Sequence, residues 1–155
     1  MNHTGDFRKR DFSGQNLAGA HFRDADLYQA AFAGASLEGA IFENCFAAEA
    51  SFEQARCARL RAANCSFYRA SFRGAELDDA LLWMCVLAGA DLRGASLKHV
   101  TLTLDCNSFE EIQVDRATGA KLAYLFGRAR SPQRKGWLDV VGETYLTRMS
   151  RVFGT

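Results

Sequence analysis

Three cysteines in this chain, Cys45, Cys65 and Cys85, are separated by intervals of twenty residues. Thiolates are good metal ligands, so a fold that brought the three side chains together would offer a candidate metal site. The chain has five cysteines. An odd number without a secretion signal is typical of reduced thiols in the cytoplasm.

Arg59, Asp79 and His99 form a second set with the same spacing. A carboxylate beside a histidine can act as an acid–base dyad, and a neighbouring arginine could bind an anion. Both kinds of chemistry require elements that place residues twenty apart next to one another. The question is therefore which elements the chain forms.

A five-residue repeat runs from Gly5 to about Leu102. A large apolar residue stands at the centre of most blocks, as at Leu27 and Phe32, and the residue two places earlier is usually Ala. A period of five fits neither a helix nor a plain strand. It fits a block whose first three residues are extended, so that the small residue and the centre both point inward.

The last two residues of each block must then turn a corner. The fifth place is often Gly, Asn or Asp, as at Gly34, Asn44 and Asp79. These residue types tolerate the backbone angles of tight turns. We therefore expect a corner every five residues, always toward the same core, so that the chain closes into a tube.

The pattern A-[D/N/S]-[L/F]-x-x resembles the pentapeptide-repeat family over residues 5–104. The resemblance implies an all-β solenoid, a right-handed quadrilateral β-helix with four blocks per coil and about five coils. Residues 105–155 are expected to form a small α-helical C-terminal cap that could also mediate dimerisation. Residues 1–4 are polar and are expected to be loose.

Four blocks per coil would stack residues that are twenty apart. In the coil of residues 45–64 three of the four centres are small, so we expect a locally less filled core or a local twist there, which Phe46 and Leu60 beside the gaps could offset. One column of the core then reads Phe12, Phe32, Phe52, Phe72 and Leu92.

Stacking brings both reactive sets together, but neither metal binding nor catalysis is favoured. The cysteines would point into a narrow apolar core, where Cys is a good small residue and a thiolate is costly. No nucleophile stacks beside His99, and no concave pocket is implied. We therefore predict no catalytic, cofactor or metal site. The outer charges are expected to form ion pairs between coils: Glu49–Arg69, Glu53–Arg73, Arg56–Glu76 and Asp78–Lys98.

Apolar side chains also fall at outward or corner positions, and such a patch needs a cover. The cover is either a partner or the chain's own tail. In the tail we expect a helical turn at residues 108–111 and helices over residues 115–129 and 135–152. The candidate interaction surface comprises Ile41, Phe46, Leu81, Trp83, Met84, Val86, Trp137, Val141 and Tyr145.

A rigid rod without a cleft is typical of a non-catalytic scaffold that binds a protein partner. The family resemblance implies an alternative, a DNA mimic that binds a type II topoisomerase such as DNA gyrase and protects it from quinolones or toxins. Such mimicry needs an acidic rod. Residues 5–55 hold eight acidic and four basic side chains, whereas residues 56–102 hold four acidic and seven basic ones.

The resemblance also implies a homodimer through the C-terminal helices. The basic stretch RARSPQRKG could touch nucleic acid, but we expect a solvated loop and no direct nucleic-acid binding. No apolar run is long enough to span a bilayer, and MNHTGDFRKRDFSG contains no secretion signal. The predicted location is the cytoplasm.

Overall fold

The structure is a computed structural model that describes residues 2–102 and 111–128. The chain divides into two compact units, Met1–Val114 and Asp115–Thr155. The helical turn predicted at residues 108–111 falls largely outside the described residues, and the helix predicted at 135–152 falls entirely outside them.

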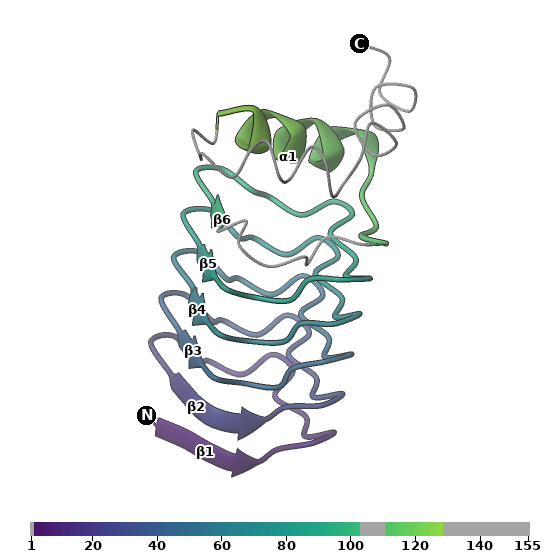
Figure 1. Ribbon diagram of the computed structural model, residues 1–155. Coiled ribbons are helices and arrows are strands. Elements are labelled where there is room, and N and C mark those ends of the chain that lie inside the picture. The colour runs from purple at the N-terminus through teal and green to yellow at the C-terminus, as the bar shows by residue number, and fades with distance from the viewer. Residues whose placement is uncertain (1, 103–110, 129–155) are drawn as a thin grey trace. The chain divides into compact units, whose positions relative to one another are not determined.

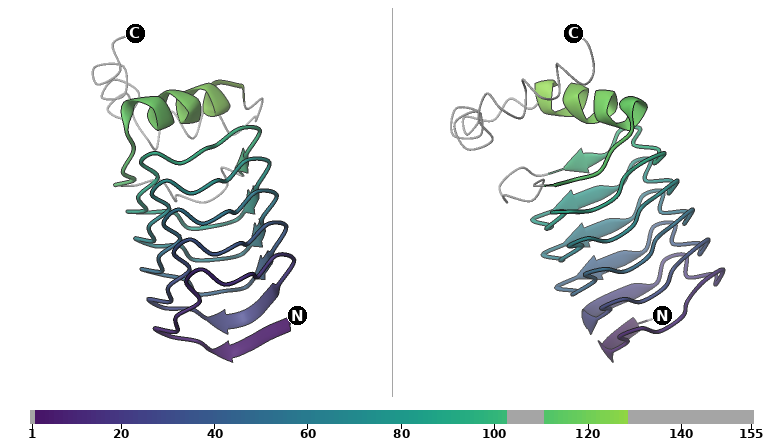
Figure 2. Two further views of the ribbon diagram at one scale, coloured as in Figure 1. Left: turned by 180° about the vertical axis from the view of Figure 1, so that it is seen from behind. Right: turned by 90° about the vertical axis from the view of Figure 1, so that its right-hand side faces the viewer.

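The first unit is a parallel β-solenoid of about five turns, which confirms the predicted fold class (Figure 1). From β2 to β5 each strand pairs with the residues twenty positions later, and the isolated bridges repeat this spacing on other sides of the coil except for the last one, Asp91–Gln113. Figure 2 shows the strands stacked in one direction on one side of the coils. In the order in which they pair, the strands are β1 (Asn2–Asp6), β2 (His21–Asp26), β3 (Ile41–Glu43), β4 (Arg61–Ala63), β5 (Leu81–Trp83) and β6 (Thr101–Leu102).

Every fifth residue from Lys9 to His99 has a positive φ, between 49° and 74°. Gly, Asn and Asp were expected at these corners, but Gln29 and Arg59 also adopt the left-handed conformation. This conformation costs an ordinary residue about 1–2 kcal/mol. Hydrogen bonds between coils offset part of the cost: the backbone N–H of Arg59 donates to the carbonyl of Asp78 at 2.9 Å.

The predicted phenylalanine ladder is confirmed. Phe32, Phe52 and Phe72 are at most 1% exposed. Their ring centroids lie 4.9 and 4.8 Å apart, and the rings are inclined by only 4° and 6°. Phe42 and Phe67 meet Phe52 edge to face. Each ring thus contacts rings on its own coil and on the neighbouring coils, so the interior is filled only because the coils stack.

The two residues that were expected to compensate for the small centres behave differently. Leu60 is 1% exposed and lies in the core, beside the small centres Cys57 and Ala62. Phe46 is 49% exposed, so it does not offset the small centres and lies outside the core, where the candidate interaction surface also places it. Phe46 immediately precedes the buried centre Ala47, and neighbouring residues of an extended segment point to opposite sides.

The expectation of a loose N-terminus is also wrong for residues 2–4, because Asn2–Asp6 form β1 and pair with β2. The register shifts between His3 and Gly5, and the imidazole of His3 stacks on the Phe22 ring at 4.6 Å. His3 therefore extends the aromatic core by one more level. The guanidinium of Arg10 lies 5.6 Å from the Phe12 ring centroid, so it covers part of this end through a cation–π contact.

The described part of the second unit is helix α1 (Arg116–Arg128). Asp115 caps it as predicted: its Oδ1 accepts the backbone N–H of Thr118 at 2.8 Å, and its carbonyl accepts that of Gly119 at 2.8 Å. Within the described residues, no helix is long and apolar enough to cross a membrane.

Candidate functional site

The cysteine ladder forms inside the solenoid. Cys45, Cys65 and Cys85 are at most 4% exposed. The backbone N–H of Cys45 points to Sγ of Cys65 at 3.5 Å. The three thiols donate to backbone carbonyls on their own coils at 3.3–3.4 Å. These thiols are therefore satisfied as protonated groups in the core.

We predict that the buried thiols are unreactive in the folded protein. Burial and the nearby Glu76 carboxylate raise the pKa of Cys57 to about 12, so almost no thiolate forms at neutral pH. Cys106 lies outside the described residues and is best replaced by Ser. In that variant, Ellman's reagent should detect no thiol at first and four after denaturation. Rapid reaction of the native protein would contradict the buried ladder.

The second reactive set lies on the exterior. His99 Nδ1 is 3.3 Å from Asp79 Oδ1, but the two side chains are 84% and 59% exposed. Arg59 reaches Glu38 at 3.8 Å. Among residues 2–102 and 111–128, no group of three or more His, Cys, Asp or Glu side chains is placed to hold a metal ion. The set is thus a solvated group of charges.

The predicted ion pairs between coils are only partly formed. Lys98 pairs with Asp78 at 3.4 Å. Glu49 and Arg69, both described, do not pair: Glu49 accepts hydrogen bonds from Tyr28 Oη and Gln29 Nε2 instead. Surface ion pairs contribute little, so a long side chain readily takes another neighbour.

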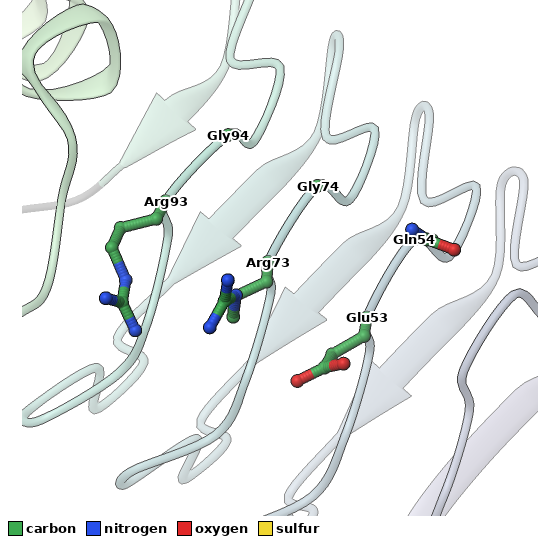
Figure 3. Close-up of a pocket in the computed structure, with 6 residues that line it drawn as sticks. All are labelled: Glu53, Gln54, Arg73, Gly74, Arg93 and Gly94. Atoms are coloured by element: carbon green, nitrogen blue, oxygen red, sulfur yellow. The ribbon is translucent and has the colours of Figure 1, made fainter.

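Glu53 and Arg73 do not form an ion pair either, although both line one shallow surface pocket of about 330 Å³. Figure 3 shows Glu53, Arg73 and Arg93 projecting from the same position of three successive coils. Glu53 accepts from Ser71 Oγ at 2.9 Å. Asp91 binds Arg93 Nη2 at 2.6 Å, and Arg73 Nε lies 4.0 Å away. The predicted pair of Arg56 and Glu76, which are also described, is a backbone bridge without a side-chain ion pair.

The Asp91 carboxylate gives a pH-dependent prediction. Hydrogen bonds from Arg93 lower its pKa below the ordinary 3.8. The stabilisation is therefore present above that value and is lost as the pH falls through the lower pKa of the folded state. Asp91→Asn should cost about 1 kcal/mol at pH 7, and the difference from wild type should shrink toward zero in acid. Urea denaturation of wild type and Asp91→Asn at several pH values measures the loss of unfolding free energy and its dependence on pH. A loss of equal size at every pH would contradict the stabilising role of the Asp91 carboxylate.

Large apolar side chains lie exposed around the corner between two faces of the solenoid. The first face carries the strands, and the second face comprises residues 26–30, 46–50, 66–70 and 86–90. Trp83 is 53% exposed and Phe46 is 49% exposed. We call the described members of the predicted interaction surface the corner surface: Ile41, Phe46, Leu81, Trp83, Met84 and Val86.

The structure adds two aromatic residues and leaves three predicted ones unplaced. Tyr68 is 39% exposed on the second face, and the Tyr28 ring stacks on Phe46 at 6.2 Å. Residues 28 and 68 hold the same position in their blocks, so the repeat alone could have identified them. The predicted surface residues Trp137, Val141 and Tyr145 lie outside the described residues.

Comparisons with known proteins agree with this architecture. The family model for pentapeptide repeats matches eight copies over residues 6–44, 48–83 and 65–103. No curated protein sequence matches the chain.

Solved structures with a similar fold come from several sources. One is a pentapeptide repeat protein of the Arabidopsis thaliana thylakoid lumen (28% identity, TM-score 0.63, 65% of this chain and 70% of that one). Another is HetL of the cyanobacterium Nostoc, involved in heterocyst differentiation regulation (22%, TM-score 0.44, 65% and 59%). A third is QnrB1, a plasmid-mediated fluoroquinolone resistance protein (20%, TM-score 0.44, 81% and 77%).

The stacked coils and the family match agree over the same residues, because the matched segments cover most of the solenoid from Asp6 to the end of β6. The corners, the inward centres and the small inward residues all recur with the period that the family model describes. The chain therefore belongs to the pentapeptide-repeat family.

Proposed function

We propose that this chain is a non-catalytic module that binds a protein partner through its corner surface. The observation that carries the proposal is the exposure of large apolar side chains outside a core that is already filled. Trp83, Phe46 and Met84 are each between 46% and 53% exposed, whereas the inward centres beside them are buried. Exposed apolar groups of this size, gathered at one corner, are typical of protein interaction sites.

The chemistry around the corner surface also favours a protein partner. Aromatic and Met side chains are enriched at protein interfaces, where they contribute most of the binding energy. In the coils of residues 61–70 and 81–90 the only charged side chains are Arg61 and Arg69. A partner with apolar anchors and an acidic rim would complement this part of the surface.

Quantitative affinity capture from a lysate of the source organism tests the proposal. Wild type, Trp83→Ser and a matched control, Arg56→Ser, are immobilised after circular dichroism has shown that all three are folded. Arg56 is exposed on another face. We expect at least one protein to be retained by wild type and by the control and to be depleted severalfold on Trp83→Ser. Identical captured proteins on all three would overturn the proposal.

A second candidate is the DNA mimic that binds DNA gyrase, and the acidic first half of the rod favours it. Residues 5–55 carry a net charge of −4, from eight acidic and four basic side chains. The second half opposes it, because a mimic needs a field of one sign along its length. A DNA gyrase supercoiling assay, with and without a quinolone, tests this candidate. Inhibition of supercoiling by the protein, or protection of gyrase from the quinolone, supports it, and no effect at any dose rejects it.

We also propose that the protein works in the cytoplasm. The four described cysteines are buried and form no disulfide bond, which supports a reducing compartment. The homodimer through the C-terminal helices remains a prediction, because α1 is described in a single copy of the chain and the helix predicted at 135–152 lies outside the described residues.

A further inference from the structure

We propose that a second copy of this chain binds the second face in an antiparallel orientation, with a two-fold axis through the coil of residues 61–80. This inference goes beyond the proposed function: it assigns Phe46 and Val86 to contacts with a second copy and leaves Trp83 to a different partner. It is carried by two independent features of the face, the spacing of its apolar side chains and the arrangement of two uncompensated charges.

Two exposed apolar side chains of the second face lie one coil on either side of Ser66. Phe46, Ser66 and Val86 occupy one outward column, because parallel bridges join residue 46 to 66 and residue 66 to 86. Phe46 is 49% exposed and Val86 is 37% exposed. The two apolar side chains therefore stand one coil below and one coil above the small polar Ser66.

A two-fold axis in the plane of the face and perpendicular to the solenoid reverses the order of the coils but leaves each column on itself. If this axis passes through Ser66, Phe46 of one copy lies opposite Val86 of the other, and the same contact occurs twice. Ser66 then lies opposite its own copy. Each large apolar side chain thus meets an apolar partner.

The second outward column fits the same axis. Tyr68 is 39% exposed in the middle coil and would face its own copy, as an aromatic pair. Ala48 and Ala88 occupy this column one coil below and above; Ala48 is only 4% exposed, so it adds no contact of its own. Small side chains on both sides of the tyrosine allow the two faces to approach.

Two charges on the face have no oppositely charged partner among the described residues. Glu49 accepts hydrogen bonds only from neutral donors, Tyr28 Oη at 3.2 Å and Gln29 Nε2 at 2.8 Å. Arg69 places its guanidinium 5.1 Å from the ring centroid of Tyr68. Glu49 and Arg69 are neighbours in one column, yet they do not pair with each other, so neither charge is neutralised by an ion pair within residues 2–102 and 111–128.

The absence of a side chain at Gly89 leaves room for the Arg69 side chain of the preceding coil. Arg69 Cγ is 2.8 Å from the position that a Cβ atom on Gly89 would occupy, so the side chain passes over the glycine of the next coil. The same two-fold axis brings Glu49 of one copy opposite Gly89 of the other. Arg69 of each copy is then placed to pair with Glu49 of the other, and two identical ion pairs flank the axis.

Sedimentation equilibrium on the full chain tests whether Glu49 and Arg69 contribute to the affinity of the dimer. Wild type should dimerise, and Glu49→Arg and Arg69→Glu should each weaken the dimer about tenfold, since each change replaces two attractions by two repulsions. The double variant should recover most of the affinity. Arg56→Glu, on another face, is the matched control and should leave the affinity unchanged. A double variant no stronger than the single ones would overturn the proposal.

Cross-linking separates this dimer from one formed through the C-terminal residues. Ser66→Cys in a Cys106→Ser background places one thiol beside the proposed axis, and Ser51→Cys on another face is the control. A short bismaleimide should join two copies of Ser66→Cys but not of Ser51→Cys. A dimer without this cross-link, or a monomer at every concentration, would overturn the proposal. Neither result affects the capture comparison, which detects a different protein through Trp83.

Discussion

Phe52→Ala should destabilise the solenoid by about 3–5 kcal/mol, the cost of truncating a buried phenylalanine. The ring is 0% exposed and stacks between Phe32 and Phe72 at 4.9 and 4.8 Å. Its neighbours are held by coils on both sides, so they cannot collapse fully into the space left behind.

Urea denaturation of Phe52→Ala and of a matched control measures this cost. The control is Arg56→Ala, four residues further along the same coil and exposed. A surface change of this kind should cost under about 1 kcal/mol. If the two variants were equally mild, the stacked aromatic core would be refuted.

Ala70→Leu should destabilise the fold by about 1–3 kcal/mol or more, because it overfills a position that the repeat keeps small. Ala70 is 0% exposed, and the large centres Phe67 and Phe72 flank it. Leu60 shows when a leucine fits at such a position: its flanking centres are the small Cys57 and Ala62. Ala70 has no such compensation.

The matched control for Ala70→Leu is Ala58→Leu, at a partly exposed outward position. Thermal denaturation should show a clear loss for Ala70→Leu and almost none for Ala58→Leu. Equal melting temperatures for Ala70→Leu and wild type would mean that the interior has room that the buried alanines do not indicate.

The sequence predicts the core well because each inward position repeats. Phe32, Phe52 and Phe72 stack as the spacing of twenty requires, and the three laddered cysteines stack in the same way. The positions of the corners were predicted, but the residue types found there were predicted only in part. Gln29 and Arg59 adopt the left-handed conformation because hydrogen bonds between coils outweigh their local preference.

The exterior and the first strand were predicted less well. Ion pairs such as Glu49–Arg69 were inferred from stacking alone, but long exposed side chains choose among several neighbours of similar energy. The polar composition of residues 1–4 does not indicate that the ring of His3 continues the aromatic core on Phe22. The position of Phe46 in its block directs the side chain outward, so it lies beside the gap left by the small centres but does not fill it.

The central claim is that the corner surface is open to partners, and the fluorescence of Trp83 tests it most directly. The chain has two tryptophans, so Trp137→Phe leaves Trp83 as the only indole. Trp83 is 53% exposed. We predict the red-shifted emission of a solvated indole and strong quenching by acrylamide in the native protein. Blue-shifted emission that is protected from acrylamide would mean that another part of the chain covers Trp83, and it would contradict the account.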